Sequence, residues 1–270
     1  MAPVSAHPAR WPIALVRRNQ VAAFVVLAYA LSWWPWLWYQ YDPATADAPI
    51  LPFGPFLASV IVLALAGGWP AVREWFAKIV HWRVGWAWFA VALLLPIALT
   101  LTATGINIMT GAQRAAAFQS PDIGSLAARF VFIFLFIGLG EEPAWRGFAL
   151  PRLLDGRSAL AAALILGLIH MVWHAPLYGI EYNSANVIPW GITVVCVSVV
   201  ICWMWLHTGG SLLLPMLLHA SNNTIALVWG MFEGGDQLRL WWIWCALWVI
   251  TTAVIVFATG KDLTRSKLAA

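Results

Sequence analysis

Residues 124–140, GSLAARFVFIFLFIGLG, contain a single charged side chain, Arg129, and they end directly before two adjacent glutamates, Glu141 and Glu142. A run of about 17–25 mostly apolar residues is long enough for a helix to cross a bilayer. The rest of the chain has the same character: of 270 residues, 62% are hydrophobic and 10% are charged, and the mean hydropathy is +0.80. Since soluble domains carry roughly 25% charged residues, the composition predicts an integral membrane protein and leaves no room for a soluble domain.

Apolar runs of membrane-spanning length recur along the whole chain. Polar or glycine- and proline-bearing connections separate eight of them: 21–40, 50–68, 85–109, 124–140, 159–179, 187–207, 212–231 and 240–259. The sequence therefore predicts an all-α, polytopic transmembrane helix bundle with about eight spans, in which residues 1–270 form a single integral membrane domain. We expect a multi-pass protein of the cell membrane, with the lipid bilayer as its solvent.

The charged residues between the runs predict how the chain is oriented. Twelve basic residues fall on one side of the membrane if there are eight spans: Arg10, Arg17, Arg18, Arg73, Lys78, Arg83, Arg146, Arg152, Arg157, Lys261, Arg265 and Lys267. The other side holds two basic residues and several acidic ones: Arg114, Arg239, Asp42, Asp47, Asp122, Glu181, Glu233 and Asp236. Because positively charged loops favour the cytoplasmic side, both termini are expected in the cytoplasm.

The first apolar run has a second interpretation. Arg17, Arg18 and the small residues at Ala28 and Ala30 are arranged as in a signal peptide with its cleavage site. The apolar run continues through Trp38, however, which favours a retained first helix.

Charge and cysteine patterns exclude other classes. The formal net charge is +4, but the basic residues are dispersed and form no stripe, so no nucleic-acid partner is expected. Cys196, Cys202 and Cys245 lie in apolar runs without CxxC spacing, and they predict neither a disulfide framework nor a thiolate metal site.

Ionisable side chains at membrane depth are costly and mark functional positions. In this chain they form three groups, each with a polar pair four residues apart: Glu142 and Arg146, His170 and His174, and His219 and Asn223. Residues four apart lie on one face of a helix, so three helices are expected to present a polar pair to a common interior. Pro143 disfavours regular helix at Glu142 and predicts a kink or a helix restart beside the two carboxylates.

Each group also has a plainer interpretation. The glutamates and Arg146 could belong to a solvated cytoplasmic loop, because charged loops are normal in membrane proteins. The histidines could form hydrogen bonds between helices, or buried His and Glu could relay protons in a proton-coupled transporter. A transporter would be favoured by an inverted repeat with paired broken helices, and the sequence shows neither.

The motifs read Glu141-Glu142-x-x-x-Arg146, then His174 followed by Ala-Pro-Leu, then His219-x-x-x-Asn223. In order and spacing they resemble the three motifs of the CPBP intramembrane proteases, which include the type II CAAX prenyl endopeptidases and bacterial relatives tied to bacteriocin maturation or self-immunity. The resemblance covers about residues 120–230, which would be the catalytic core. It departs at one position, because the family's second motif usually reads Phe-x-x-x-His and His170 stands in place of the phenylalanine.

The resemblance implies an intramembrane endopeptidase that hydrolyses peptide bonds near the cytoplasmic membrane face. In that mechanism Glu141 is the general base that activates a water molecule, and His174 shares this water. His219 and Asn223 donate hydrogen bonds to the developing oxyanion. The substrate would be a peptide or a segment of a membrane protein, and a non-catalytic scaffold or immunity protein on the same fold is the alternative.

Supporting and metal-binding roles are also expected. Glu142 and Arg146 would pair and hold the kinked segment in place, with His170 as a further supporting residue. The candidate zinc ligands are Glu141, His174 and His219. The sequence contains no HExxH, and Asn223 is a poor zinc ligand but a good oxyanion donor, so a metal-free glutamate mechanism is slightly favoured over a metalloprotease.

Overall fold

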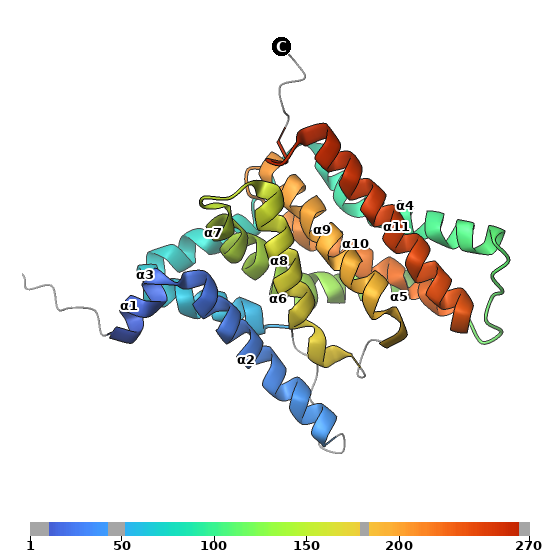
Figure 1. The fold of residues 1–270 in the computed structure, drawn as a ribbon, viewed down its shortest axis with the longest axis horizontal. Coiled ribbons are helices and arrows are strands. Elements are labelled where there is room, and N and C mark those ends of the chain that lie inside the picture. The colour runs from blue at the N-terminus through green and yellow to red at the C-terminus, as the bar shows by residue number, and fades with distance from the viewer. Residues whose placement is uncertain (1–10, 43–51, 179–183, 265–270) are drawn as a thin grey trace, which may run out of the picture.

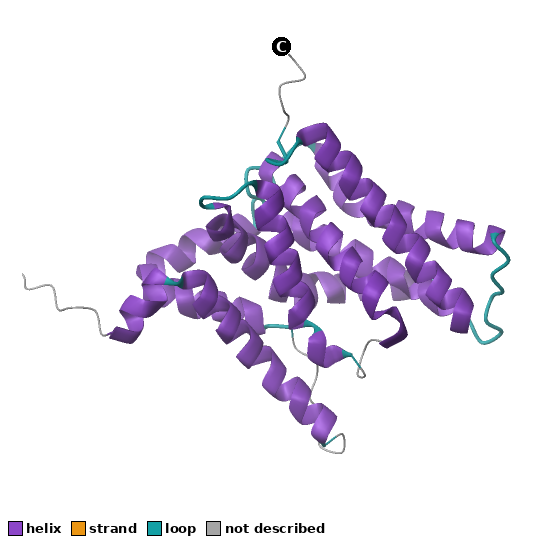
Figure 2. Ribbon diagram, viewed as in Figure 1, coloured by secondary structure: helices purple, strands orange, loops and turns teal. Residues whose placement is uncertain are grey.

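The computed structural model describes residues 11–42, 52–178 and 184–264. Within these ranges the protein consists of helices joined by loops and contains no strand (Figure 2). The expected all-α architecture is therefore confirmed. Five residues used above to predict the orientation lie outside the described ranges: Arg10, Asp47, Glu181, Arg265 and Lys267.

The α-helices are, in chain order, α1 (Trp11–Arg18), α2 (Gln20–Tyr41), α3 (Gly54–Ile79), α4 (Trp86–Met109), α5 (Ile123–Phe132), α6 (Leu139–Glu142), α7 (Leu150–Leu154), α8 (Ala159–Trp173), α9 (Val187–His207), α10 (Leu213–Ile225) and α11 (Gly234–Thr259). Two π-helical segments, η2 (Ile133–Gly138) and η3 (Pro143–Ala149), flank α6. Short 3-10 segments are η4 (Ala175–Leu177), η5 (Ser184–Asn186) and η6 (Ala226–Met231).

Seven helical segments of the described chain are long and apolar enough to cross a membrane: Gln20–Tyr41, Gly54–Ile79, Trp86–Met109, Ile123–Leu154, Ala159–Leu177, Val187–His207 and Gly234–Thr259. The eighth expected span, 212–231, is instead made of α10, with 13 residues, and the 3-10 segment η6. Because a spanning helix needs about 20 residues, α10 by itself crosses only part of a bilayer. The polytopic fold is confirmed, whereas the cytoplasmic placement of both termini stays a prediction.

Helices α8, α9 and α10 occupy the middle of the molecule, with α2 and α3 on one side and α4 and α11 on the other (Figure 1). In the apolar windows of α8 and α9, 50% and 56% of the residues are buried, against 22% in α2. The outer helices turn large apolar side chains outward, as expected for helices that face lipid and not water. The central helices are therefore the ones that can enclose a polar site.

Small residues bring α8 and α9 close together. A Cβ atom added at Gly167 of α8 would lie 2.9 Å from the Cα of Val195 on α9. In the same interface the Ser198 hydroxyl donates to the carbonyl oxygen of Ala163 at 2.9 Å. Close backbone approach through small residues, with a hydrogen bond between helices, is the usual way in which helices associate in membranes.

The helical run that carries both glutamates is longer than predicted. The sequence predicted a span that ends at residue 140, but residues Ile123–Leu154 form one continuous helical run. The irregularity expected at Pro143 takes the form of the two π-helical segments around α6, and such segments occur frequently at functional sites. The indole N–H of Trp75 on α3 donates to the Pro143 carbonyl oxygen at 2.9 Å, which fixes this run against α3.

Candidate active site

Both glutamates are buried inside the bundle. Glu141 is 3% exposed, Glu142 is 1% exposed, and Arg146 on η3 is 1% exposed. The interpretation that places these side chains in a solvated loop is therefore wrong. Burying a charged group without a partner is costly, so the contacts of each carboxylate define the site.

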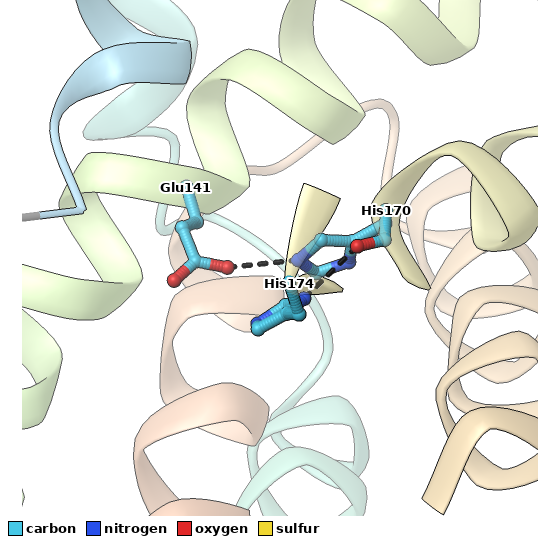
Figure 3. Close-up of side chains that lie close together, drawn as sticks. All are labelled: Glu141, His170 and His174. Carbon is cyan, nitrogen blue, oxygen red and sulfur yellow. Dashed lines mark hydrogen bonds and ion pairs between the residues drawn. The ribbon is translucent and has the colours of Figure 1, made fainter. Parts of the chain in front are cut away.

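Glu141 faces the two histidines at the end of α8 (Figure 3). Its Oε2 accepts a hydrogen bond from Nε2 of His170 at 2.9 Å. The Nδ1–H of His174 donates to the backbone carbonyl oxygen of His170 at 2.9 Å, because a carbonyl can only accept. A neutral His174 ring then has an unprotonated Nε2, which can accept a hydrogen bond or bind a metal ion.

Glu142 has a different set of partners. The Nη1 of Arg146 lies 3.1 Å from Oε1 and 3.0 Å from Oε2 of this carboxylate. The Nδ1 of His219, on α10, donates to Oε1 at 2.8 Å. Glu142 therefore joins the η3 segment to α10 and is neutralised by a guanidinium, which is always charged in proteins.

The end of α10 adds two amides and meets a cation from α5. The Nδ2 of Asn222 donates to Oδ1 of Asn223 at 3.2 Å. Arg129 donates through Nε and Nη2 to the backbone oxygen of Asn223, each at 3.4 Å. With its Oδ1 engaged, the Asn223 side chain has its NH₂ group as a remaining donor, and Asn223 lines the cavity described next.

A single cavity of about 380 Å³ joins these groups. All the residues expected to be catalytic or supporting line it: Glu141, Glu142, Arg146, His170, His174, His219 and Asn223. They come from α6, η3, the end of α8 and α10, so the structure brings together the three motifs that the sequence places about 30–80 residues apart. Arg129 and Asn222 line the same cavity.

Aromatic rings of α8 and α9 surround His174, and hydrogen bonds from α2 hold the end of α8 in place. Trp173 and Trp190 pack against the His174 ring with centroids 4.8 Å and 5.1 Å away. The Tyr29 hydroxyl donates to the Ile169 carbonyl oxygen at 2.5 Å, and the Trp33 indole donates to that of Trp173 at 2.8 Å. Carbonyls in the last turn of a helix lack partners within the helix, so the contact with Trp173 satisfies such a group and positions the histidines.

The side chains that could hold a metal ion are Glu141, His170 and His174. One ligand atom from each lies within 4.8 Å of the others, and all three residues are buried. This set differs from the expected ligands in one member, because His219 instead contacts Glu142.

Several residues of the cavity could not be predicted from the sequence. Arg129 stood out as a charge within an apolar run, but nothing in its spacing connected it with α10. The tryptophans around His174 gave no signal, because the chain has 20 tryptophans and membrane helices collect them at both interfaces. The direct contact between His170 and Glu141 likewise required the tertiary structure.

The fold and the site together define a polytopic membrane protein with a buried carboxylate–imidazole cluster on a shared cavity. Residues 123–225 match the family described as type II CAAX prenyl endopeptidase Rce1-like. The chain is also 24% identical over 182 residues to the CAAX prenyl protease 2 of Methanococcus maripaludis, an alignment that covers 63% of this chain and 67% of that protein. Both matches agree with the resemblance that the motifs showed, and they indicate a CAAX-protease-like membrane hydrolase.

Proposed function

We propose that this protein is an intramembrane endopeptidase in which Glu141 activates the water molecule that attacks the peptide bond. The observation that carries the proposal is the convergence of Glu141, His174, His219 and Asn223 on one cavity. Amide hydrolysis needs a base for the water, donors for the oxyanion and a proton for the leaving amine. Each of these needs has a candidate among the four side chains.

Glu141 and His174 are suited to hold and deprotonate the water. Glu141 bonds to His170 through Oε2, and a carboxylate has acceptor capacity on both oxygens. The backbone contact of His174 directs its Nδ1–H away from the water, so Nε2 of the neutral ring can accept a hydrogen bond from it. The proton that Glu141 takes from the water is then delivered to the leaving amine.

His219 and Asn223 are suited to bind the oxyanion. Asn223 presents its NH₂ group because Asn222 occupies its Oδ1. His219 gives its Nδ1–H to Glu142, so its Nε2 donates when the ring is charged, and the adjacent carboxylates balance that charge. In peptidases one such donor contributes on the order of 10²–10³-fold to the rate.

The substrate class follows from the cavity walls and from the relative. Aliphatic side chains line the cavity beside the polar cluster: Ile133, Ile137, Val194, Val197, Ile201 and Leu218. We propose a peptide or membrane-protein segment with aliphatic residues near the cleaved bond. The name of the archaeal relative adds a candidate, a prenylated peptide with a carboxyl-terminal CAAX sequence, and cleavage is proposed to occur near the cytoplasmic face of the cell membrane.

The test is peptide cleavage by the full chain in liposomes, followed by mass spectrometry of the products. Wild type and Glu141→Gln are compared on a membrane-peptide library and on matched peptides with and without a prenyl group. The amide keeps the size of the side chain but cannot take up a proton, so cleavage should fall on the order of 10²–10⁴-fold. Equal cleavage by the two proteins, with equal thermal melts, would end the glutamate mechanism. If the wild type cleaves no peptide but binds a partner or carries a solute, the protein is a scaffold or a transporter instead.

A further inference from the structure

Glu141, His170 and His174 form a compact set of metal-ligand types inside the bundle. The distances between their ligand atoms do not exceed 4.8 Å, and all three residues are buried. Glu141 and His170 are already in contact at 2.9 Å, and Figure 3 shows the His174 ring directly beside them. Exposed acidic clusters are common and carry little meaning, but a buried set with two imidazoles is unusual in a chain that is 10% charged.

The spacing of the two histidines favours a metal ion. His170 and His174 are four residues apart at the end of α8, and a pair at this spacing presents both rings on one helix face, as in the zinc-binding HExxH helix. Ligand bonds to zinc are about 2.0–2.2 Å long in a tetrahedral site, which puts neighbouring ligand atoms about 3.4 Å apart. The observed ligand atoms lie within 4.8 Å of one another, so zinc binding needs them to approach by about 1.4 Å or less from that upper limit.

The surroundings of the His174 ring also suit zinc. The hydrogen bond from His174 Nδ1 to the His170 carbonyl oxygen is the kind of contact that orients a metal-binding imidazole and selects its tautomer. Two imidazoles with one carboxylate select zinc over magnesium or calcium, which prefer oxygen ligands. Three protein ligands leave the fourth position open toward the cavity.

We propose that Glu141, His170 and His174 bind a zinc ion and that the zinc-loaded protein is inactive as a peptidase. The second part rests on the proposed function, because it requires Glu141 to be the base. A carboxylate bound to zinc is a much weaker base than a free one, because the positive ion opposes uptake of a proton. In HExxH peptidases the base is a glutamate that is not itself a ligand, whereas here the neighbouring Glu142 is already paired with Arg146 and His219.

His170 decides whether the site exists. The family resembled by the motifs usually has phenylalanine at this position, and a phenylalanine would leave only Glu141 and His174. Zinc binding is therefore a property of this chain, and the substitution His170→Phe removes the ligand while keeping a ring of similar size in the pocket beside Trp145.

The test measures zinc binding directly, on the full chain in nanodiscs with buffered free Zn²⁺. Wild type should bind one ion per chain. Since losing an outer-shell partner already costs about 10–100-fold in metal affinity, losing a direct ligand in His170→Phe should weaken binding by about 100-fold or more. His207→Phe is the control, because His207 is another histidine near the end of a long helix, bonded from Nδ1 to the Trp203 carbonyl oxygen at 2.8 Å, and does not line the cavity. It should bind zinc as the wild type does.

Two further measurements keep the result independent of how the variant folds. X-ray absorption at the zinc edge of the wild type should show two imidazole ligands and one carboxylate at about 2.0–2.2 Å. Zinc should inhibit peptide cleavage by wild type and by His207→Phe. Each variant's rate is compared with its own rate without zinc, and half-inhibition of His170→Phe should need about 100-fold more zinc than half-inhibition of wild type.

The outcomes separate this inference from the proposed function. Absence of zinc binding, equal affinity in wild type and His170→Phe, or a spectrum without two imidazoles overturns the site. Activation by zinc overturns the inactive state. If cleavage proceeds without zinc while no zinc binds, the inference fails and the proposed function stands. If zinc binds at this site but no peptide is cleaved with or without it, the site stands and the proposed function fails.

Discussion

Glu141 and Glu142 are neighbours in the chain and are equally buried, yet their surroundings differ. Glu141 contacts an imidazole, that of His170, at 2.9 Å. Glu142 is held by Arg146 at 3.0 Å and by His219 at 2.8 Å. The two carboxylates point to different partners because adjacent residues on a helix do not share a face.

This difference is the basis for proposing different roles for the two carboxylates. The guanidinium of Arg146 is permanently charged, and together with His219 it ties the Glu142 carboxylate to one place. The imidazole beside Glu141 can be neutral or charged, so the contact does not force either state on the carboxylate. We infer that Glu142 is used for structure and Glu141 for chemistry.

The largest effect is expected from removing the cation beside Glu142. Arg146→Met keeps an unbranched side chain but leaves a buried carboxylate without its guanidinium, and breaking a buried pair in this way costs about 3–5 kcal/mol. The measurement is the free energy of unfolding in mixed micelles. Arg157→Met, at an exposed arginine, is the control and should stay within about 0.5 kcal/mol of wild type. A similarly small change for Arg146→Met would contradict the structural role of Glu142.

The next largest effect is expected for Asn223, the proposed oxyanion donor. Asn223→Ala removes an oxyanion donor and should lower the rate of peptide cleavage on the order of 10²–10³-fold. The thermal melt should change little, because Asn223 is only partly buried. Asn19→Ala, in the link between α1 and α2 and far along the chain from the site, should leave the rate unchanged. A loss of stability without a loss of rate per folded molecule would make Asn223 a packing residue.

Contacts between residues close together in the chain could be predicted from the sequence, whereas contacts between distant residues could not. The pair of Glu142 and Arg146 follows from their spacing alone, since residues four apart are neighbours on a helix. The contact from Glu141 to His170 spans 29 residues, and helical periodicity does not determine how α6 faces α8. The resemblance to a family supplied the grouping of the motifs but not this contact, because the family usually has phenylalanine at position 170.

The bounds of the membrane spans could also be predicted only in part. Long apolar runs such as Val187–His207 were predicted with their bounds unchanged, because length and hydropathy are sufficient there. The run after Gly210 is less apolar, because it contains His219, Asn222 and Asn223, and it forms the shorter α10, which ends at Ile225 and continues as a 3-10 segment. Hydropathy alone did not predict where this helix ends.

The smallest effect tests how firmly α8 presents its histidines to Glu141. In Gly167→Ala the new methyl group would lie 2.9 Å from the Val195 Cα and 3.0 Å from the Ser198 Cβ, so α8 and α9 must move apart at a cost of about 1–3 kcal/mol. Cleavage should fall together with stability. Gly105→Ala on α4 is the matched control, since nothing lies within 4 Å of its added Cβ, and it should be neutral or slightly stabilising. Equal melts for the two variants would argue against close α8–α9 packing.

The central claim is that two adjacent glutamates divide the work, and one comparison of rates tests it most directly. Cleavage of the same membrane peptide is measured in liposomes for Glu141→Gln and Glu142→Gln, each per folded molecule as judged by its thermal melt. The account predicts that Glu141→Gln loses on the order of 10²–10⁴-fold in rate with little change in stability, whereas Glu142→Gln loses mainly stability and keeps most of its rate per folded molecule. The reverse pattern, or equal losses of rate in the two variants, would contradict it.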